Sequence, residues 1–583
     1  MRNNIQKRIW VIIAGLIFAT VIIVGRLFVF MVLDGPNWRE KAINYTRVVD
    51  KPERGIIYDR NGAILTANTQ DYRVGVSPAF VTKPDSLATS LTTILQIPKL
   101  QVLNMVDPPT SDEEGNENPP PTYVLISRRV NSETAEMLRG LEDQGVQLEP
   151  IPRRFYPQDE LLCHTLGYLD LNEEGKFGLE AYYQQEMAGQ EDSEIIDISP
   201  LSVQRGVIAR EGADLVLTID RSIQHLVEQQ LKQALEIYGA ESGTVIVMDP
   251  RTGAILALAN MPCYSPANYF EYVTGDGAVT DDVPFPNPAV NAQFEPGSVM
   301  KLVTMAAALD SNTVLPSTTY YDAGSIEVGG HVSYNWDKSA PGTTDMTTLL
   351  ARSLNVGAAT IATWMGTDIF YEYLQRFNFG RPTGIDLAGE ASGIMPLPGD
   401  ENWAESFLAT NAYGQSLAVT PIQMVSAIAA IANDGYQMQP YLVQEIHAGN
   451  GVFMHQPDVQ NRPITPKTAE LLTNMAVQAV AREVPEAQVP GYTIAGKTGT
   501  AQIPGEFGYL EDDVIGSFVG WLPADNPEIV VFVKLDKPTS ARWGSQTAAP
   551  LFADLVEELV VLLDIPPDNV RLRADVMAAR QEN

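Results

Sequence analysis

Two nearly unbroken apolar segments, residues 243–249 and 253–259, flank a three-residue turn in this 583-residue chain. Strands with one face in solvent alternate apolar and polar residues, but these two segments barely alternate. They therefore predict a β-hairpin in a sheet that is buried on both faces. Helical patterns, then strands, then a last helix follow at 300–480, 516–535 and 549–563. This order predicts an α+β domain in which helices cover both sides of a central antiparallel sheet.

The length of the chain predicts several domains, with one boundary near residues 210–215, where a strand leads into a helix. Nearer the N-terminus, turn residues 59–62 predict a hairpin, and residues 84–106 predict helices joined by short loops. The acidic, proline-rich residues 107–122 predict an exposed loop. His164 is expected to be a packed polar residue rather than a base. The predicted segments are a tail, an anchor, two domains and a second tail, at 1–8, 9–33, 34–212, 213–565 and 566–583.

An apolar stretch at residues 9–33 is interrupted by the single charge of Arg26. At about 1.5 Å per residue, a helix of this length crosses a hydrocarbon core of roughly 30 Å. Basic residues precede the stretch and few follow it, which predicts a cytoplasmic N-terminus and the bulk of the chain outside the cell membrane. No small-residue cleavage pattern follows, so we expect an uncleaved single-pass anchor. A buried helix of a soluble domain is the alternative interpretation.

Composition argues against several classes of function. The chain has 39 basic and 72 acidic residues, a net charge of −33, and lacks the basic excess typical of nucleic-acid binding. Two cysteines, Cys163 and Cys263, are too few for a disulfide framework or a thiolate metal site, and the sequence leaves their pairing open. The five histidines show no metal-ligand spacing, which gives little support to zinc or Ser-His-Asp chemistry. We expect no metal and no organic cofactor.

The clearest candidate for chemistry is Ser298, which stands three residues before Lys301 at the start of a helical apolar run. Residues three apart share a helix face, so the lysine amine is expected beside the serine hydroxyl. A serine needs an adjacent base to become a nucleophile. A lysine, with an ordinary pKa of about 10.4, can be that base only if burial or a nearby cation lowers its pKa. Taken alone, the motif also occurs by chance on many helices.

Two later motifs lie at usable distances. Ser353, Leu354 and Asn355 are expected in a short loop between helices, with both polar side chains in one cleft. Residues 497–500, Lys-Thr-Gly-Thr, predict a strand that carries a cation, hydroxyls, and a glycine that permits close approach of a ligand.

The ordered set of three motifs resembles that of penicillin-binding proteins and class A β-lactamases, although Leu354 stands where their middle motif has Asp. Glu295-Pro296-Gly297-Ser298 resembles the division-type, FtsI-like form of the nucleophile motif. Three blocks that β-lactamases lack resemble the pedestal module of class B penicillin-binding proteins, at residues 54–62, 154–157 and 178–180.

The resemblance extends from the anchor to about residue 565. It implies a membrane-anchored, multidomain α+β protein with a β-rich, non-catalytic pedestal (dimerisation) domain at 34–212. A transpeptidase domain of β-lactamase-like fold follows at 213–565. Residues 542–546 depart from the family, because many relatives have a Gly-Gly-rich stretch there, and this leaves the shape of the cleft rim open.

Carried over to this sequence, the resemblance implies an acyl-transfer site. Ser298 would attack the D-Ala-D-Ala carbonyl of a peptidoglycan stem peptide and release D-Ala. Lys301 would accept the proton of Ser298, and Ser353 would relay it to the leaving amine. Lys497 would supply the positive potential that keeps Lys301 neutral. Which residue acts as the base is disputed for this class of motif.

The remaining motif residues are implied in substrate binding. Asn355 would hold Lys301 and the substrate amide, while Thr498 and Thr500, separated by Gly499, would bind the terminal carboxylate. Backbone N–H groups of Ser298 and Thr500 would form the oxyanion hole, where losing one donor typically costs about 10² to 10³ in rate.

The preferred hypothesis is a transpeptidase of septal wall synthesis that β-lactams acylate. The alternatives are an elongation-type class B enzyme, a β-lactam sensor, and a hydrolase such as a β-lactamase or carboxypeptidase. The expected partners are stem peptides, β-lactams, the membrane, a glycosyltransferase of the FtsW kind and other division proteins. The anchor and Arg26 are the predicted contact with that glycosyltransferase.

Overall fold

The computed structural model describes residues 2–29, 52–109, 121–170, 172–191, 209–272, 284–449, 451–505 and 508–573. Most of the predicted loop at 107–122 and the end of the predicted anchor therefore lie outside the described residues. The chain forms two compact units, residues 1–52 with 190–210 and residues 53–189 with 211–583. The first unit contains α1 (Arg2–Phe28) and the pair β7 (Gln190–Glu191) and β8 (Ala209–Arg210). Among the described residues, no helix has the length and apolarity that crossing a membrane requires.

A five-stranded sheet forms the centre of the second unit. Its order is β11 (Ile255–Met261), β10 (Ser242–Met248), β22 (Ile529–Asp536), β21 (Gly508–Leu522) and β20 (Ala495–Gly505). All of its strand pairs are antiparallel. The predicted hairpin and the predicted central antiparallel sheet are both confirmed.

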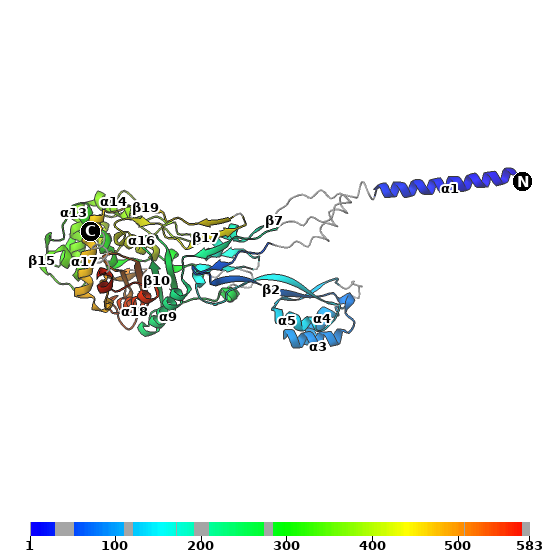
Figure 1. Cartoon of the computed structure of the whole chain (residues 1–583), viewed down its shortest axis with the longest axis horizontal. Coiled ribbons are helices and arrows are strands. Elements are labelled where there is room, and N and C mark those ends of the chain that lie inside the picture. The colour runs from blue at the N-terminus through cyan, green and yellow to red at the C-terminus, as the bar shows by residue number, and fades with distance from the viewer. Residues whose placement is uncertain are drawn as a thin grey trace. The chain divides into compact units, whose positions relative to one another are not determined.

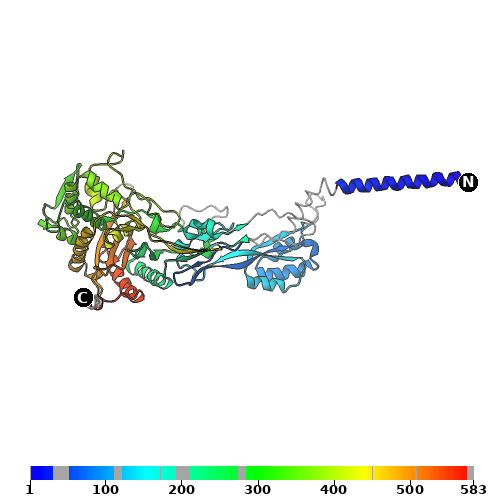
Figure 2. The same cartoon turned by 45° about the horizontal axis from the view of Figure 1, so that its top comes forward.

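Apolar side chains cover this sheet on both faces. Ile246 and Met248 of β10 belong to one hydrophobic cluster, whereas Val245 and Val247 belong to the other, because successive side chains of a strand point to opposite faces. Figures 1 and 2 show α9 (Arg221–Tyr238) and α18 (Ala548–Leu562) side by side at the second cluster. The main covering helices are α11 (Met300–Asp310) and α16 (Pro421–Ala432) on the first face, with α9 and α18 on the second.

A second sheet is shared by the N-terminal and C-terminal parts of this unit. Its order is β18 (Gly451–Met454), β17 (Val443–Ala448), β9 (Asp214–Leu217), β1 (Ile57–Tyr58), β2 (Ile64–Val76) and β3 (Val124–Val130), with β4 (Val146–Phe155) also paired to β2. The predicted boundary between residues 212 and 213 lies immediately before β9. Since β9 pairs with β1 on one side and β17 on the other, the two predicted domains share one hydrogen-bonded sheet.

Local predictions for the N-terminal part hold. Asp59 caps the turn between β1 and β2 by accepting the N–H groups of Asn61 and Ala63. The region 84–106 forms α3 (Pro84–Leu95) and α4 (Lys99–Val106), which pack with α5 (Ser132–Arg139) against β2 and β3.

Cys163 and Cys263 form a disulfide that joins α6 (Cys163–Leu166) to the segment after β11, which answers the question that the sequence left open. The neighbouring His164 is 4% exposed and packs edge-on against Tyr264. Burial lowers the pKa of His164 to about 4, so the imidazole is neutral at physiological pH. The prediction that His164 is a packed polar residue is confirmed.

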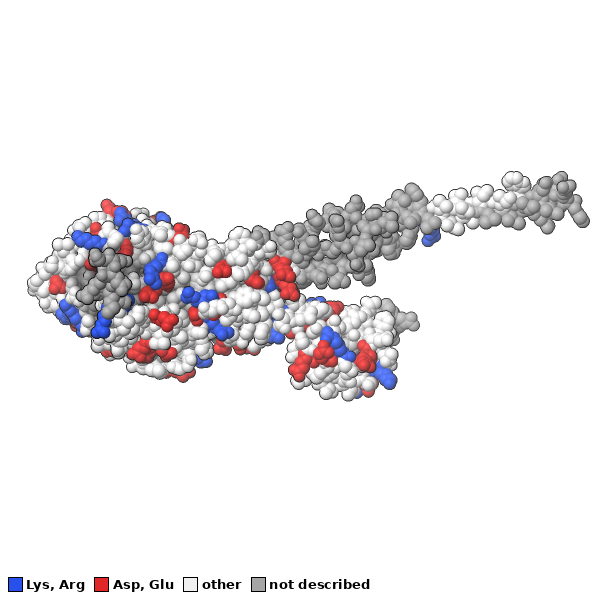
Figure 3. Space-filling view, viewed as in Figure 1, with Lys and Arg blue, Asp and Glu red and all other residues white. Residues whose placement is uncertain are grey.

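The other elements connect these layers. Four two-stranded ribbons pair β5 (Tyr168–Leu169) with β6 (Gly175–Lys176), β12 (Thr319–Asp322) with β15 (Gly342–Asp345), β13 (Ser325–Val328) with β14 (His331–Tyr334), and β16 (Gln437–Met438) with β19 (Val459–Asn461). The remaining α-helices are α7 (Gly178–Tyr182), α8 (Gln184–Met187), α10 (Pro288–Asn291), α12 (Met346–Arg352), α13 (Asn355–Met365), α14 (Thr367–Arg376), α15 (Phe407–Ala412) and α17 (Pro466–Glu483). On the face shown in Figure 3, basic and acidic side chains are interspersed.

Candidate active site

The predicted nucleophile lies at the tip of a buried helix. A 3₁₀ turn, η4 (Gly297–Val299), leads directly into α11, whose residues 300–309 are all buried. Gly297 has a φ of +54°, and a Cβ there would lie 2.9 Å from the carbonyl oxygen of Thr500. Its N–H donates to the carbonyl of Gly414 at 3.0 Å. The turn is therefore held between β20 and the loop after α15, and Ser298 stays half-buried at its tip.

Lys301 is the centre of the site. Its Nζ lies 2.8 Å from Ser298 Oγ, 3.1 Å from Ser353 Oγ, 2.7 Å from the carbonyl of Ser353 and 2.7 Å from Asn355 Oδ1. The side chain is 1% exposed and has no carboxylate within hydrogen-bond distance among the described residues. Burial lowers the pKa of Lys301 well below its ordinary value, and repulsion from Lys497 lowers it further.

The middle motif forms the predicted loop between two helices. Ser353 ends α12 in the left-handed region, with a φ of +56°, and Asn355 begins α13. This turn directs both side chains to Lys301, while the intervening Leu354 is fully buried in the core. Asn355 Nδ2 donates to the carbonyl of Tyr334 at 3.1 Å, which fixes its amide. The residue that departs from the family pattern is therefore a packing residue.

The third motif lies on β20, beside the nucleophile turn. Lys497 is 3% exposed, and its Nζ contacts the carbonyl and hydroxyl of Thr498 at 3.2 and 3.3 Å. Burial lowers the pKa of Lys497 to about 7, against an opposing effect of Glu483. Gly499 was predicted to give a ligand access to the backbone. In the structure, a Cβ there would meet Ser517 Oγ of β21 at 2.3 Å and Val299 at 3.0 Å, so the glycine makes room for the neighbouring strand and the nucleophile turn.

Glu295 connects the nucleophile turn to two distant segments. Its carboxylate accepts the N–H of Ser416 at 2.8 Å and the hydroxyl of Tyr509, at 3.1 and 3.0 Å from its two oxygens. Burial raises the pKa of Glu295, and these hydrogen bonds oppose that rise. Gly414, Ser416 and Tyr509 were not predicted as site residues. The sequence signal for Gly414 and Ser416 is a glycine two residues before a serine, and Tyr509 has none.

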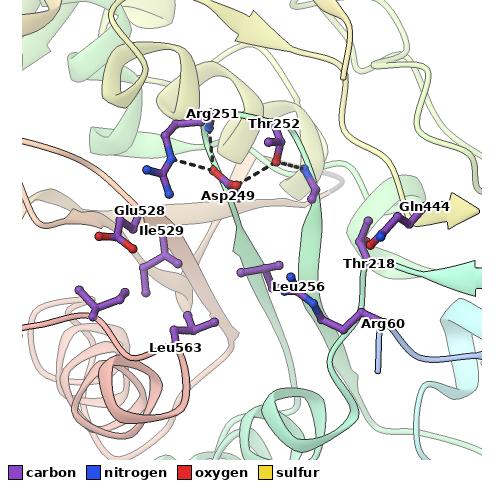
Figure 4. A pocket seen from close by; sticks show the side chains of 12 residues that line it. Arg60, Thr218, Asp249, Arg251, Thr252, Leu256, Gln444, Glu528, Ile529 and Leu563 are labelled. Carbon is purple, nitrogen blue, oxygen red and sulfur yellow. Dashed lines mark hydrogen bonds and ion pairs between the residues drawn. The ribbon is translucent and has the colours of Figure 1, made fainter. Parts of the chain in front are cut away.

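A separate cavity of about 240 Å³ lies away from these residues (Figure 4). Arg60, Gln444 and the turn between β10 and β11 line it, and none of the predicted catalytic residues does. Asp249 in this turn accepts the N–H of Arg251 and the hydroxyl of Thr252, so the polar groups on this side stabilise the turn itself. We assign no catalytic role to the cavity.

The structure brings Ser298, Lys301, Ser353 and Asn355 into one hydrogen-bonded cluster and places residues 497–500 on the adjoining strand. A serine hydroxyl on a buried lysine amine, with a second serine and an asparagine on the same amine, is typical of the serine acyltransferases that recognise penicillin.

Comparison with known proteins agrees with this class. The family profile of the penicillin binding protein transpeptidase domain matches residues 243–557, and that of the penicillin-binding protein dimerisation domain matches residues 49–217. Stage V sporulation protein D of Bacillus subtilis is 31% identical over 89% of this chain and 79% of its own length. Peptidoglycan D,D-transpeptidase FtsI of Escherichia coli K12 is 26% identical over 97% of this chain and 93% of its own length. The crystal structure of penicillin binding protein 3 from Mycobacterium tuberculosis with aztreonam superposes with a TM-score of 0.67 at 27% identity, covering 89% of this chain and 97% of that one.

The chain therefore belongs to the penicillin-binding protein transpeptidase family. The predicted resemblance to class B, FtsI-like members is confirmed, as is the prediction that the protein is a transpeptidase enzyme. The combination of a dimerisation domain and a transpeptidase domain is confirmed as well.

Proposed function

We propose that Ser298 is the nucleophile of a D,D-transpeptidase that cross-links peptidoglycan stem peptides in septal wall synthesis, and that β-lactams acylate the same hydroxyl. The observation that carries this proposal is that four oxygens lie within 3.1 Å of Lys301 Nζ. The names of relatives support the septal part, as does the Glu-Pro-Gly-Ser form of the nucleophile motif.

Hydrogen-bond counting supports a neutral Lys301 as the base. Four oxygens surround Lys301 Nζ. Two of them, the carbonyl oxygen of Ser353 and Oδ1 of Asn355, can only accept hydrogen bonds. A neutral amine has two N–H groups for these acceptors and one lone pair. That lone pair is then left for the Ser298 hydroxyl, whose proton it takes as the oxygen attacks. A charged ammonium has no lone pair for this step.

Acyl transfer then proceeds in two displacements. Ser298 Oγ bonds to the carbonyl carbon of the penultimate D-Ala, and the peptide bond to the terminal D-Ala breaks. The leaving nitrogen takes the proton that Lys301 accepted, passed on through the hydroxyl of Ser353, which lies 3.1 Å from Nζ. The amine of a second stem peptide attacks the resulting ester, loses a proton to the same relay, and restores the Ser298 hydroxyl.

The strand β20 is the proposed binding site for the terminal carboxylate. Thr498 and Thr500 would donate hydroxyl hydrogen bonds to it, and the backbone N–H groups of Ser298 and Thr500 would stabilise the oxyanion. Lys497, with a pKa of about 7, is only partly charged at neutral pH before a substrate binds. A bound carboxylate would favour its charged form, which in turn holds Lys301 neutral.

Fluorescent penicillin tests the nucleophile. The full-length protein should label within minutes and keep the label for hours, and it should release D-Ala from a peptide that ends in D-Ala-D-Ala. The Ser298→Ala variant should do neither. Loss of the label within seconds would instead favour the hydrolase hypothesis, and labelling of the variant would overturn the assignment of Ser298.

We also propose the segment boundaries given above, with residues 9–33 as a membrane anchor and the transpeptidase domain outside the membrane. Support comes from the apolar stretch itself and from α1, on which Trp10 and Phe18 are 70% and 68% exposed. Alkaline extraction of membranes is the test. Full-length protein should stay with the membrane fraction, and a variant that lacks residues 1–33 should not.

The last part of the proposal is that the protein acts at the division septum together with a glycosyltransferase of the FtsW kind. A fluorescent fusion should gather at mid-cell, and a lateral-wall signal would favour the elongation-type alternative. Co-purification of the glycosyltransferase with the full-length protein should weaken in an Arg26→Leu variant, since Arg26 is the only charge within the proposed anchor. Unchanged recovery would remove Arg26 from the contact.

A further inference from the structure

Two exposed tryptophans from distant parts of the sequence meet beside the catalytic residues. Trp336 follows β14, and Trp543 lies between β22 and α18, within the segment that departs from the family pattern. Their ring centroids are 5.2 Å apart with an interplanar angle of 67°, an edge-to-face pair. Trp336 is 54% exposed and Trp543 is 37% exposed. Aromatic side chains of this size are usually more buried, so the exposure needs a reason.

Trp336 is fastened to the middle catalytic motif. Its indole Nε1–H donates to the carbonyl of Arg352 at 3.1 Å, directly before Ser353. The preceding residue, Asn335, is 2% exposed and accepts the N–H of Val356, directly after Asn355. The loop that carries Trp336 therefore moves with Ser353 and Asn355.

Trp543 is fastened to the third motif. The N–H of the next residue, Gly544, donates to Oγ1 of Thr500 at 3.0 Å. A Cβ on Gly544 would lie 2.2 Å from the carbonyl oxygen of Gly499, so this loop lies directly on β20. A threonine hydroxyl that accepts one hydrogen bond can still donate another, so the contact leaves Thr500 able to bind a carboxylate.

The two rings thus close a bridge between the two walls of the site. Ser353 and Asn355 form one wall, Thr500 lies on the other, and the nearly fully buried Lys301 and Lys497 lie below. A ligand bonded to Ser298 and lying between these walls must send its side chain out beneath or between the rings. An edge-to-face pair is worth only about 2- to 12-fold in an equilibrium constant, so a ligand can part it.

We propose that Trp336 and Trp543 are specificity-determining residues, an aromatic gate that favours acylation by ligands with a flat apolar side chain next to the reacting carbonyl. An aromatic side chain replaces the ring–ring contact with contacts to both rings. A ligand without a side chain parts the rings and gains no contact in return. The proposal rests on the assignment of Ser298 as the nucleophile.

The test compares two penicillins that share one ring system. Benzylpenicillin has an aromatic side chain, and 6-aminopenicillanic acid has none. The ratio of their second-order acylation rate constants, measured on the full-length protein, should fall by about 2- to 12-fold in Trp336→Ala and in Trp543→Ala. Because each single variant leaves one ring to contact the side chain, the ratio should fall further in the double variant than in either single variant. Trp336→Phe and Trp543→Phe should retain the ratio within about twofold, as the edge-to-face contact survives.

Trp364→Ala is the matched control. Trp364 is similarly exposed, at 46%, but lies at the end of α13 that is distant from Asn355. It should leave the ratio unchanged. An unchanged ratio in both gate variants, or an equal fall in the control, would overturn the gate. If the alanine variants do not fold, tryptophan fluorescence provides the test. Benzylpenicillin should change the fluorescence of the wild-type protein. A change of the same size in both phenylalanine variants would contradict the proposal. Failure of the nucleophile assignment looks different, because Ser298→Ala would then still be acylated.

Discussion

Two clusters of buried ionisable side chains in this molecule differ in composition. In the N-terminal part, Glu180 is fully buried between two guanidinium groups. Its carboxylate accepts hydrogen bonds from Nε of Arg54 at 2.6 Å and from Nε of Arg154 at 2.7 Å. At the candidate active site, Lys301 and Lys497 are both nearly fully buried and both basic, and among the described residues their hydrogen-bond partners are neutral oxygens.

The difference separates a structural role from a chemical one. In the Glu180 cluster, opposite charges hydrogen-bond one another and hold β4, α7 and the start of the N-terminal domain together. Two buried amines would repel each other if both were charged, and burial disfavours the charged form of each. A proton in the second cluster is therefore easy to remove, which acid–base catalysis requires.

The largest expected effect is that of Lys301→Met. The acylation rate constant for fluorescent penicillin should fall by about 10² to 10⁴, because the proposed general base is lost. The free energy of unfolding should stay the same or rise, since a buried polar amine without a carboxylate partner among the described residues is replaced by an apolar side chain. An acylation rate constant within tenfold of the wild-type value would contradict the catalytic role of the lysine cluster.

Glu180→Gln should have the opposite pattern. It leaves two buried guanidinium groups without their carboxylate, so the free energy of unfolding in urea should fall by about 3 to 5 kcal/mol. Acylation by the folded fraction should not change. Glu372→Gln on α14 serves as the control, because its pair with Arg376 is exposed and should contribute at most about 1 kcal/mol. A similar loss in both variants would show that burial is not the cause.

The disulfide sharpens the comparison, because Cys163 and Cys263 tie the two parts together across 100 residues of chain. Cys163→Ser should lower the free energy of unfolding by about 2 to 5 kcal/mol. The acylation rate constant of the folded protein should not change. A fall in that rate constant would show that the N-terminal part controls the catalytic cluster, and the two regions would no longer be separable.

The smallest effect is a pH dependence. Lys497 has a pKa of about 7, and the charged form that the proposal requires is lost as the pH rises through that value. The second-order acylation rate constant of the free enzyme should therefore fall above about pH 7, approaching tenfold per pH unit. In Lys497→Arg, whose guanidinium stays charged, this limb should disappear. An identical limb in the variant would assign the titration to another group.

Much of the fold was predictable because its signals are local. The hairpin of β10 and β11 is visible in two apolar runs around a turn, and α9 follows a helix cap at Asp220, whose side chain accepts two backbone N–H groups. The shared sheet was not predictable. The parallel pairing of Ile57 with Leu215 joins residues that are far apart, and neither two-residue β1 nor four-residue β9 has a periodic pattern of its own.

The site divides in the same way. Ser298, Lys301, Ser353, Asn355 and residues 497–500 were found by motif spacing and resemblance, and the structure places them together. The supporting contacts depend on tertiary packing. Glu295 and Tyr509 are 214 residues apart, and the Trp336–Trp543 pair joins two loops without a shared motif. Such partners have no signature in a single sequence, because only the folded chain brings them into contact.

The central claim is that the amine of Lys301 is neutral in the resting enzyme. Nuclear magnetic resonance of the full-length protein with ¹³C-labelled lysine ε-carbons measures this directly, and Lys301→Arg identifies the signal by its loss. The account predicts the chemical shift of a neutral amine at pH 8, where an ordinary lysine with a pKa of about 10.4 stays charged. A Lys301 signal that keeps the shift of a charged ammonium up to pH 10 would contradict it.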